Sequence, residues 1–127
     1  MARLLATALL ILAATSASAA DTPKIGQDAL VERMAAAEPG LVVLDVRAPQ
    51  EFAEGHVPGA INIPHEDLEA RIGELGWARD ADVVVYCRSG RRSEIALGVL
   101  EKAGFSRRFH LEGDFLAWSA AGRPVER

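Results

Sequence analysis

Two runs of apolar residues constrain the fold of this 127-residue chain more than any other feature. Residues 41–46 read Leu-Val-Val-Leu-Asp-Val, and residues 82–86 read Asp-Val-Val-Val-Tyr. Consecutive apolar, β-branched positions are typical of strands in a parallel sheet, because helices cover both faces of such a sheet. We therefore expect an α/β fold in which both runs are central strands.

Helices and shorter strands are predicted to alternate around these two runs. The predicted elements are a helix from Gln27 or Asp28 that ends by Gly40, a helix at 50–54, a strand at 60–63, a helix at 65–75, a helix at about 93–103, a strand at 107–111 and a helix at 114–121. This order predicts a three-layer sandwich with a mainly parallel central sheet flanked by helices. The sites of such folds lie at the carboxyl ends of the strands.

The composition indicates one globular domain and limits its partners. Hydrophobic residues make up 50% of the chain and charged residues 25%, which excludes a disordered chain, and the length fits one domain of about 100–200 residues. With 14 Lys and Arg against 18 Asp and Glu, the formal net charge is -4. A polybasic nucleic-acid binder needs the opposite balance, so we expect no nucleic-acid partner.

The first 20 residues have the pattern of a secretory signal peptide. Arg3 precedes an apolar run over residues 4–14, and small residues occupy 15–20. The run is shorter than the roughly 20 residues that a transmembrane helix needs. We expect cleavage after Ala19 or Ala20, a mature domain over residues 21–127, a periplasmic or secreted location, and no stable membrane insertion after cleavage.

Cys87 is the only cysteine, which excludes an internal disulfide, a paired-thiol redox motif and a multi-cysteine zinc site. It follows the second apolar run and precedes the sequence Arg-Ser-Gly-Arg-Arg, which leads into a predicted helix. Helix N-termini and neighbouring cations stabilise a thiolate, so Cys87 is predicted to be a catalytic nucleophile. The alternative is a buried, inert cysteine beside solvated arginines.

The five residues after Cys87 are predicted to bind an anionic substrate. Backbone N–H groups in a tight loop at a helix N-terminus converge on anions. Guanidinium groups add further donors, and a glycine permits a positive φ angle. The predicted substrate-binding residues are Arg88, Ser89, Gly90, Arg91 and Arg92.

Four ordered segments carry a resemblance to a known family. They are residues 44–47 with 51–52 (Leu-Asp-Val-Arg, Glu-Phe), 55–64 (Gly-His-Val-Pro-Gly-Ala-Ile-Asn-Ile-Pro), 85–93 (Val-Tyr-Cys-Arg-Ser-Gly-Arg-Arg-Ser) and 111–113 with Trp118 (Leu-Glu-Gly, Trp). Together they extend over nearly all of the predicted mature domain. In these segments the chain resembles a single-domain rhodanese, a sulfurtransferase module with a rhodanese-like fold.

The resemblance implies a thiosulfate sulfurtransferase that needs no cofactor. Cys87 would accept a sulfane sulfur from a small anionic donor, thiosulfate or a related persulfide, and pass it to cyanide or a thiol in ping-pong order. A second class of function stays open, namely a persulfide carrier or thiol-sensing module that docks a protein partner. Because an exposed lone thiolate in an oxidising compartment needs an external reductant, a thiol-reducing protein is a further expected partner.

Loop length distinguishes sulfur transfer from oxyanion chemistry within this resemblance. The resemblance implies a six-residue loop for sulfur transfer, and here Arg92 follows Cys87 after four intervening residues. Related phosphatases and arsenate reductases have five intervening residues, which would place the arginine at Ser93. Phosphatase or arsenate reductase activity is therefore the weaker alternative.

Asp45 and Arg47 follow the first apolar run and are expected at the same sheet edge as Cys87. They can shape the substrate pocket, but a structural ion pair is the preferred interpretation. Asp114 stands where the family commonly has a second glycine after Gly113. Aspartate tolerates a left-handed backbone better than most residues, and its charge near the loop is expected to weaken binding of a doubly charged donor.

The histidines and aromatic residues are predicted to have structural roles. His56, between glycines, is expected to brace a turn through a ring nitrogen. His65 and His110 show no metal-ligand spacing with Cys87, so no metal is expected. The aromatic residues expected in the core are Trp77, Tyr86, Phe115 and Trp118.

Overall fold

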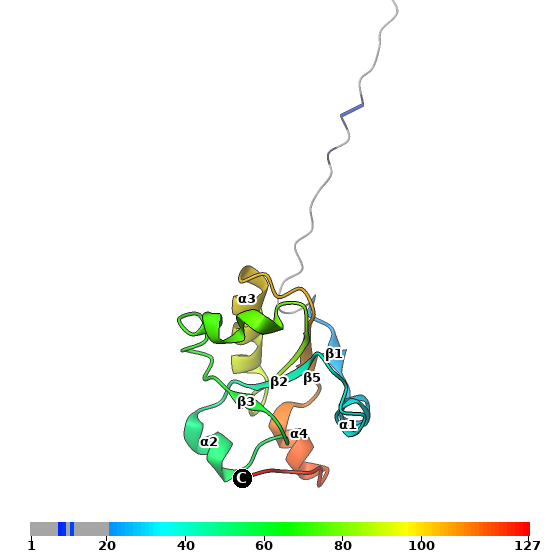
Figure 1. Ribbon diagram of the computed structural model, residues 1–127, viewed down its shortest axis with the longest axis vertical. Coiled ribbons are helices and arrows are strands. Elements are labelled where there is room, and N and C mark those ends of the chain that lie inside the picture. The colour runs from blue at the N-terminus through cyan, green and yellow to red at the C-terminus, as the bar shows by residue number, and fades with distance from the viewer. Residues whose placement is uncertain (1–7, 10, 12–20) are drawn as a thin grey trace, which may run out of the picture.

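The computed structural model describes residues 8–9, 11 and 21–127 (Figure 1). The predicted signal peptide falls almost entirely on residues 1–7, 10 and 12–20, which lie outside the described residues. The signal peptide and its cleavage site therefore stay predictions. In the described part of the chain, no helix is long and apolar enough to cross a bilayer.

The described residues form a five-stranded sheet in which every paired strand is parallel to its neighbour. The strands are β1 (Lys24–Ile25), β2 (Leu41–Asp45), β3 (Ile61–Asn62), β4 (Asp82–Tyr86) and β5 (Arg108–Leu111), in the spatial order β1-β5-β4-β2-β3. The two strongly apolar runs are β2 and β4, neighbours at the centre of the sheet. The predicted α/β architecture is confirmed.

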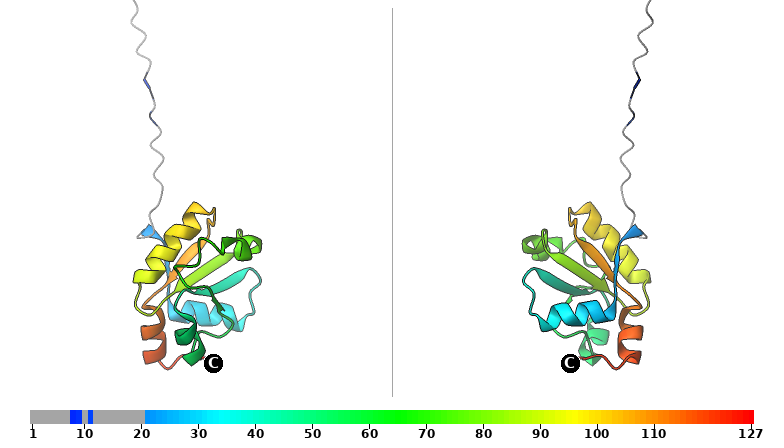
Figure 2. Two further views of the ribbon diagram at one scale, coloured as in Figure 1. Left: turned by 90° about the vertical axis from the view of Figure 1, so that its left-hand side faces the viewer. Right: turned by 90° about the vertical axis from the view of Figure 1, so that its right-hand side faces the viewer.

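Helices cover both faces of this sheet, as Figure 2 shows for α1 and α3 on opposite sides. The helices are α1 (Gln27–Ala35), α2 (Pro49–Glu54), the 3₁₀ helix η2 (Ile72–Ala78), α3 (Arg91–Lys102) and α4 (Asp114–Ala120). Side chains of β4 alternate between two buried clusters. Val83 and Val85 pack with α3 and η2, whereas Val84 and Tyr86 pack with α1 and α4. Burial on both faces explains the unbroken apolar pattern of the central strands.

The segment over residues 65–78 differs from the prediction. The helix expected at 65–75 is absent; turns occupy 65–71, and η2 extends through the expected loop to Ala78. Leu68 and Leu75 are nevertheless buried, so the apolar spacing was satisfied by a tighter conformation. Its bonds include Glu74 N–H to Arg71 O at 2.9 Å, an i to i+3 pattern. Glycines at 73 and 76 disfavour a regular α-helix here.

At the periphery of the fold one further prediction was wrong, and one strand had not been predicted. Trp77 is 69% exposed instead of packed in the core, and its indole N–H donates to Glu74 O at 2.9 Å. Strand β1, which pairs with β5, was not predicted because two residues carry no periodic signal. Tyr86 and Trp118 are buried as expected, and Phe115 packs against their cluster.

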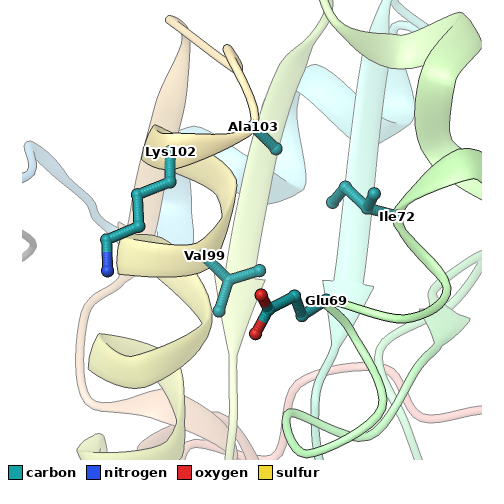
Figure 3. A pocket seen from close by; sticks show the side chains of 5 residues that line it. All are labelled: Glu69, Ile72, Val99, Lys102 and Ala103. Carbon is teal, nitrogen blue, oxygen red and sulfur yellow. The ribbon is translucent and has the colours of Figure 1, made fainter.

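A shallow groove lies between α3 and the turn segment that precedes η2 (Figure 3). Ile72, Val99 and Ala103 line it, with Glu69 and Lys102 at its sides. Its α3 residues belong to the last turns of the helix, at the end opposite to Cys87. The groove is thus separate from the predicted catalytic loop.

Candidate active site

The candidate site lies where β2 and β4 end at the same edge of the sheet. Asp45, the last residue of β2, is in register with Tyr86, the last residue of β4. Cys87 follows Tyr86 directly, and residues 88–90 connect it to α3. The parallel pairing therefore places Cys87 and Asp45 at neighbouring strand ends, as the sequence predicted.

Cys87 is buried, and its sulfur accepts a hydrogen bond from the loop backbone. The Gly90 N–H donates to Cys87 Sγ at 3.0 Å, which closes the loop around the sulfur. Gly90 has a φ of +125°, a conformation that a residue with a side chain rarely adopts. Cys87 is only 1% exposed, so the expectation that its side chain is exposed is wrong. The thiol-reducing protein expected as a partner stays a prediction.

The first residues of α4 donate backbone hydrogen bonds to Cys87 and to the loop that follows it. Phe115 N–H donates to Cys87 O at 3.0 Å, and Leu116 N–H donates to Arg88 O at 3.1 Å. Gly113, before α4, has a φ of +77°, and a Cβ there would lie 2.4 Å from the Ala117 side chain. The tight entry into α4 is what brings its backbone against the loop.

The three loop arginines have different surroundings. Arg88 and Arg91 are exposed, and neither forms an ion pair within the described residues. Arg92 donates from both terminal nitrogens to the Glu51 carboxylate of α2, at 2.6 and 3.0 Å. These bonds hold the pKa of Glu51 below its usual value. The charge of Arg92 is therefore compensated, whereas Arg88 and Arg91 are available to attract anions.

Asp45 and Arg47 form the expected structural ion pair. Arg47 donates to Asp45 Oδ2 at 2.6 Å and to the Gly55 carbonyl oxygen at 2.7 Å, and the pair is buried. The Arg47 guanidinium also lies 4.2 Å from the centre of the Phe115 ring. It thereby joins the end of β2 to α2 and α4, the two elements beside the loop.

Asp114, which contacts the loop after Cys87, has the left-handed backbone conformation that aspartate tolerates better than most residues, with a φ of +52°. Its carboxylate accepts hydrogen bonds from Cys87 N–H at 2.9 Å, Ser93 Oγ at 2.8 Å and His110 Nε2 at 3.0 Å. Burial acts to raise the pKa of Asp114, but these donors, His110 foremost, outweigh it and hold the pKa below the usual value. The hydrogen bonds thus hold a negatively charged carboxylate against the backbone of Cys87.

A cavity of about 320 Å³ adjoins the loop. Arg88 from the loop and Arg47 line it together with residues of α2 and α4: Glu51, Glu54, Gly55, Phe115, Leu116 and Ser119. The lining combines cationic and carboxylate groups with two apolar side chains. This composition suits a small polar molecule more than an extended apolar one.

His56 braces the turn after α2, as predicted. Its ring stacks on Phe52 with centroids 3.6 Å apart, and Nδ1 hydrogen-bonds to the Phe52 carbonyl oxygen at 2.8 Å. Its backbone also exchanges two hydrogen bonds with Glu126 near the C-terminus. Among the described residues, no group of three His, Cys, Asp or Glu side chains could hold a metal ion.

Sequence reasoning gave no role to two residues that contact the site. Glu51 pairs with Arg92, and a carboxylate in the first turn of α2 is the only sequence signal for that cationic partner. His110 has no metal-ligand spacing in the sequence, yet it pairs with Asp114 across the junction of β5 and α4. The separation of Glu51 and Arg92 by 41 positions left no local pattern for that pair.

Comparison with known proteins agrees with this geometry. Residues 27–121 match the family model described as the Rhodanese-like domain. A "Sulfurtransferase" of Allochromatium vinosum is 38% identical over 102 residues, which cover 80% of this chain and 92% of the relative. A "Putative sulfur carrier protein YrkF" of Bacillus subtilis is 31% identical over 105 residues, covering 83% of this chain and 55% of the relative.

A solved structure has the same fold. The rhodanese-related protein of Thermoplasma volcanium superimposes with a TM-score of 0.71 at 32% sequence identity, covering 82% of this chain and 97% of that one. The family match includes β2, β4, the loop from Cys87 and α4. The chain belongs to the rhodanese-like domain family.

Proposed function

We propose that this protein is a sulfurtransferase in which Cys87 carries the transferred sulfur as a persulfide. The observation that carries the proposal is the Gly90 N–H that donates to Cys87 Sγ at 3.0 Å within a loop closed by Arg92. A backbone donor aimed at the sulfur stabilises a thiolate before attack, and it also stabilises the persulfide anion that follows. Family membership supports sulfur transfer in general.

The proposed donor is thiosulfate or a related persulfide, and the proposed acceptor is cyanide or a thiol. In the first half-reaction the Cys87 thiolate attacks the outer sulfur of thiosulfate, the S–S bond breaks, and sulfite leaves with the electron pair. In the second, cyanide attacks the outer sulfur of the persulfide, which restores the thiolate and forms thiocyanate. Backbone groups from Arg88 to Arg92 bind the donor, and the exposed Arg88 and Arg91 attract it.

The test combines turnover with mass spectrometry of residues 21–127. Wild type and Cys87→Ser are assayed for thiocyanate from thiosulfate and cyanide, and each is weighed after exposure to donor alone. Because Cys87 is the only cysteine, a gain of one sulfur atom identifies the site without peptide mapping. We expect loading and turnover in the wild type and neither in the variant, with equal melting temperatures showing that both are folded. Wild-type protein that neither loads nor turns over would contradict the proposal.

A persulfide carrier is the second candidate. Cys87 is 1% exposed, which limits the access of large acceptors unless a partner protein shapes the approach. The similarity to a putative sulfur carrier protein supports the same idea. Loading of Cys87 by a donor, without turnover by cyanide or small thiols, would favour the carrier over the enzyme.

We also propose that residues 1–20 direct the protein to the periplasm or the exterior. The apolar run and the small residues before Asp21 support this proposal. The measurement is the N-terminal mass of the protein isolated from each cell fraction. A mature chain that begins at Ala20 or Asp21 outside the cytoplasm is expected, and a chain retained whole in the cytoplasm would contradict it.

A further inference from the structure

Asp114 accepts hydrogen bonds from both ends of the segment 87–93, which contains the loop after Cys87 and the first residues of α3. Its Oδ1 accepts from the Cys87 backbone N–H at 2.9 Å and from Ser93 Oγ at 2.8 Å, and these two residues flank the loop. On the loop itself, a Cβ built at Gly90 would lie 3.3 Å from Asp114 Oδ2. The carboxylate therefore lies directly against the backbone that surrounds the reactive sulfur.

The Asp114 carboxylate has one histidine among its hydrogen-bond partners. His110 Nε2 lies 3.0 Å from both carboxylate oxygens and must donate its N–H to them. Its other two donors, Cys87 N–H and Ser93 Oγ–H, carry no charge. Asp114 is 3% exposed, so water screens its negative charge poorly.

Other charges around the sulfur are paired or exposed. Asp45 pairs with Arg47. Arg92 pairs with Glu51. Arg88 and Arg91 are exposed, and solvent screens them more than the buried carboxylate.

The short distance from Asp114 to the sulfur makes its charge matter. The backbone N and Sγ of one cysteine are three covalent bonds apart, so the carboxylate lies within about 7 Å of the sulfur. That separation is below the Debye length of about 8 Å at physiological salt. The negative charge of Asp114 therefore repels an anion that approaches Cys87, and the repulsion energy is proportional to the charge of that anion.

We propose that Asp114 sets the charge class of the sulfur donor, favouring monoanionic or neutral sulfane sulfur compounds over dianions such as thiosulfate. The inference rests on the proposed function and narrows its substrate. Asp114 is a positioning residue, since it acts through the loop backbone and its charge, and it does not itself bond to the reacting sulfur.

The test compares two donors of similar size and different charge. Thiosulfate carries two negative charges and releases sulfite; methanethiosulfonate carries one and releases methanesulfinate. Each transfers its outer sulfur to the Cys87 thiolate, leaving the same persulfide. In ping-pong kinetics kcat/KM for the donor reports the loading step alone, so the ratio of the two kcat/KM values isolates donor charge.

Two variants separate the charge of Asp114 from its hydrogen bonds. Asp114→Asn keeps an acceptor oxygen for Cys87 N–H and tolerates the positive φ angle, but it removes the charge. We expect the thiosulfate to methanethiosulfonate ratio to rise about three- to tenfold in this variant. Asp114→Gly also tolerates the backbone but loses the hydrogen bonds, so kcat/KM is expected to fall with both donors while their ratio still rises.

A second measurement does not depend on sulfur transfer. Cys87 is alkylated with anionic iodoacetate and with neutral iodoacetamide, and the ratio of the two rates is expected to rise by a similar factor in Asp114→Asn. If both ratios in Asp114→Asn stay within about 1.5-fold of wild type, far below the Coulomb expectation, the inference is overturned. If the alkylation ratio rises but Cys87 never gains sulfur, the proposed function fails while the charge effect of Asp114 stands.

Discussion

The Arg47 guanidinium and the Asp45 carboxylate are 2.6 Å apart at the end of β2, with side chains only 4% and 0% exposed. Arg47 also donates to the Gly55 carbonyl oxygen, so it joins β2 to the end of α2. A buried ion pair is valuable chiefly because either partner alone would be an uncompensated charge. The pair therefore holds the end of β2 in place beside the loop that follows Cys87.

The first prediction concerns this pair. Asp45→Asn leaves Arg47 buried without its counter-charge, which is expected to lower the free energy of unfolding by about 3–5 kcal/mol. Urea unfolding monitored by circular dichroism measures the loss. The double variant Asp45→Asn with Arg47→Met removes both charges and is expected to regain part of it. Equal destabilisation of the single and double variants would show that burial of the charge is not the cause.

Tyr86→Phe tests the hydrogen bond between the tyrosine hydroxyl and the segment after α2. The Val57 N–H donates to Tyr86 Oη at 3.0 Å, and both residues are 0% exposed. Burial raises the pKa of Tyr86, which keeps the hydroxyl neutral. The variant leaves a buried N–H without an acceptor, so we expect a loss of about 1–3 kcal/mol in chemical unfolding. A variant as stable as wild type would mean that the Val57 N–H finds another acceptor.

Gly113→Ala is expected to destabilise the start of α4 by more than the cost of placing alanine at a positive φ angle. Gly113 and Gly59 have φ angles of +77° and +76°, but a Cβ at Gly113 would lie 2.4 Å from Ala117 Cβ, whereas one at Gly59 meets nothing within 4 Å. Gly59→Ala therefore measures the backbone cost, about 1–3 kcal/mol.

The excess loss in Gly113→Ala measures the steric clash with Ala117. We expect Gly113→Ala to be the less stable of the two variants in thermal unfolding and to load Cys87 with sulfur more slowly, because α4 binds the loop carbonyls. Equal melting temperatures would contradict the clash.

Asp82 is expected to make stability fall in acid. Hydrogen bonds from Arg107, and less strongly from Arg33, hold the pKa of Asp82 below its usual value despite burial. A lowered folded-state pKa means that the stabilisation is fully present above the unfolded pKa of about 3.9 and is lost as pH falls through the folded pKa. Urea unfolding between about pH 7 and pH 2.5 should show this loss, and Asp82→Asn should show less of it.

The control for this pH dependence is Glu74→Gln. Glu74 forms an ion pair with Arg71 at 2.7 Å, but both side chains are exposed, at 54% and 40%. Exposed pairs contribute little to stability, so the acid dependence of this variant should match that of wild type. A larger effect from Glu74→Gln than from Asp82→Asn would show that burial does not decide which carboxylate matters.

Local patterns in the sequence were sufficient for the central sheet and for the position of Cys87 at the end of β4. The apolar runs that form β2 and β4 have apolar side chains on both faces. A parallel sheet covered by helices on both sides buries these two faces. The position of Cys87 was predictable because a strand, a glycine-containing loop and a helix are contiguous in the chain, whereas its catalytic role stays a prediction. The apolar spacing over residues 65–75 predicted the wrong helix, because it reports which side chains are buried and not the hydrogen-bond pattern between them.

Only the tertiary structure decided the electrostatics of the site. The sequence has three arginines after Cys87, but folding pairs Arg92 with Glu51, buries Cys87 to 1% exposure and directs the Cys87 N–H to Asp114. These contacts join residues that are 27 to 41 positions apart. The order of residues determines the chemistry that the loop can carry, whereas the charge that its substrate meets depends on long-range packing, because Coulomb interactions follow distance and burial instead of sequence separation.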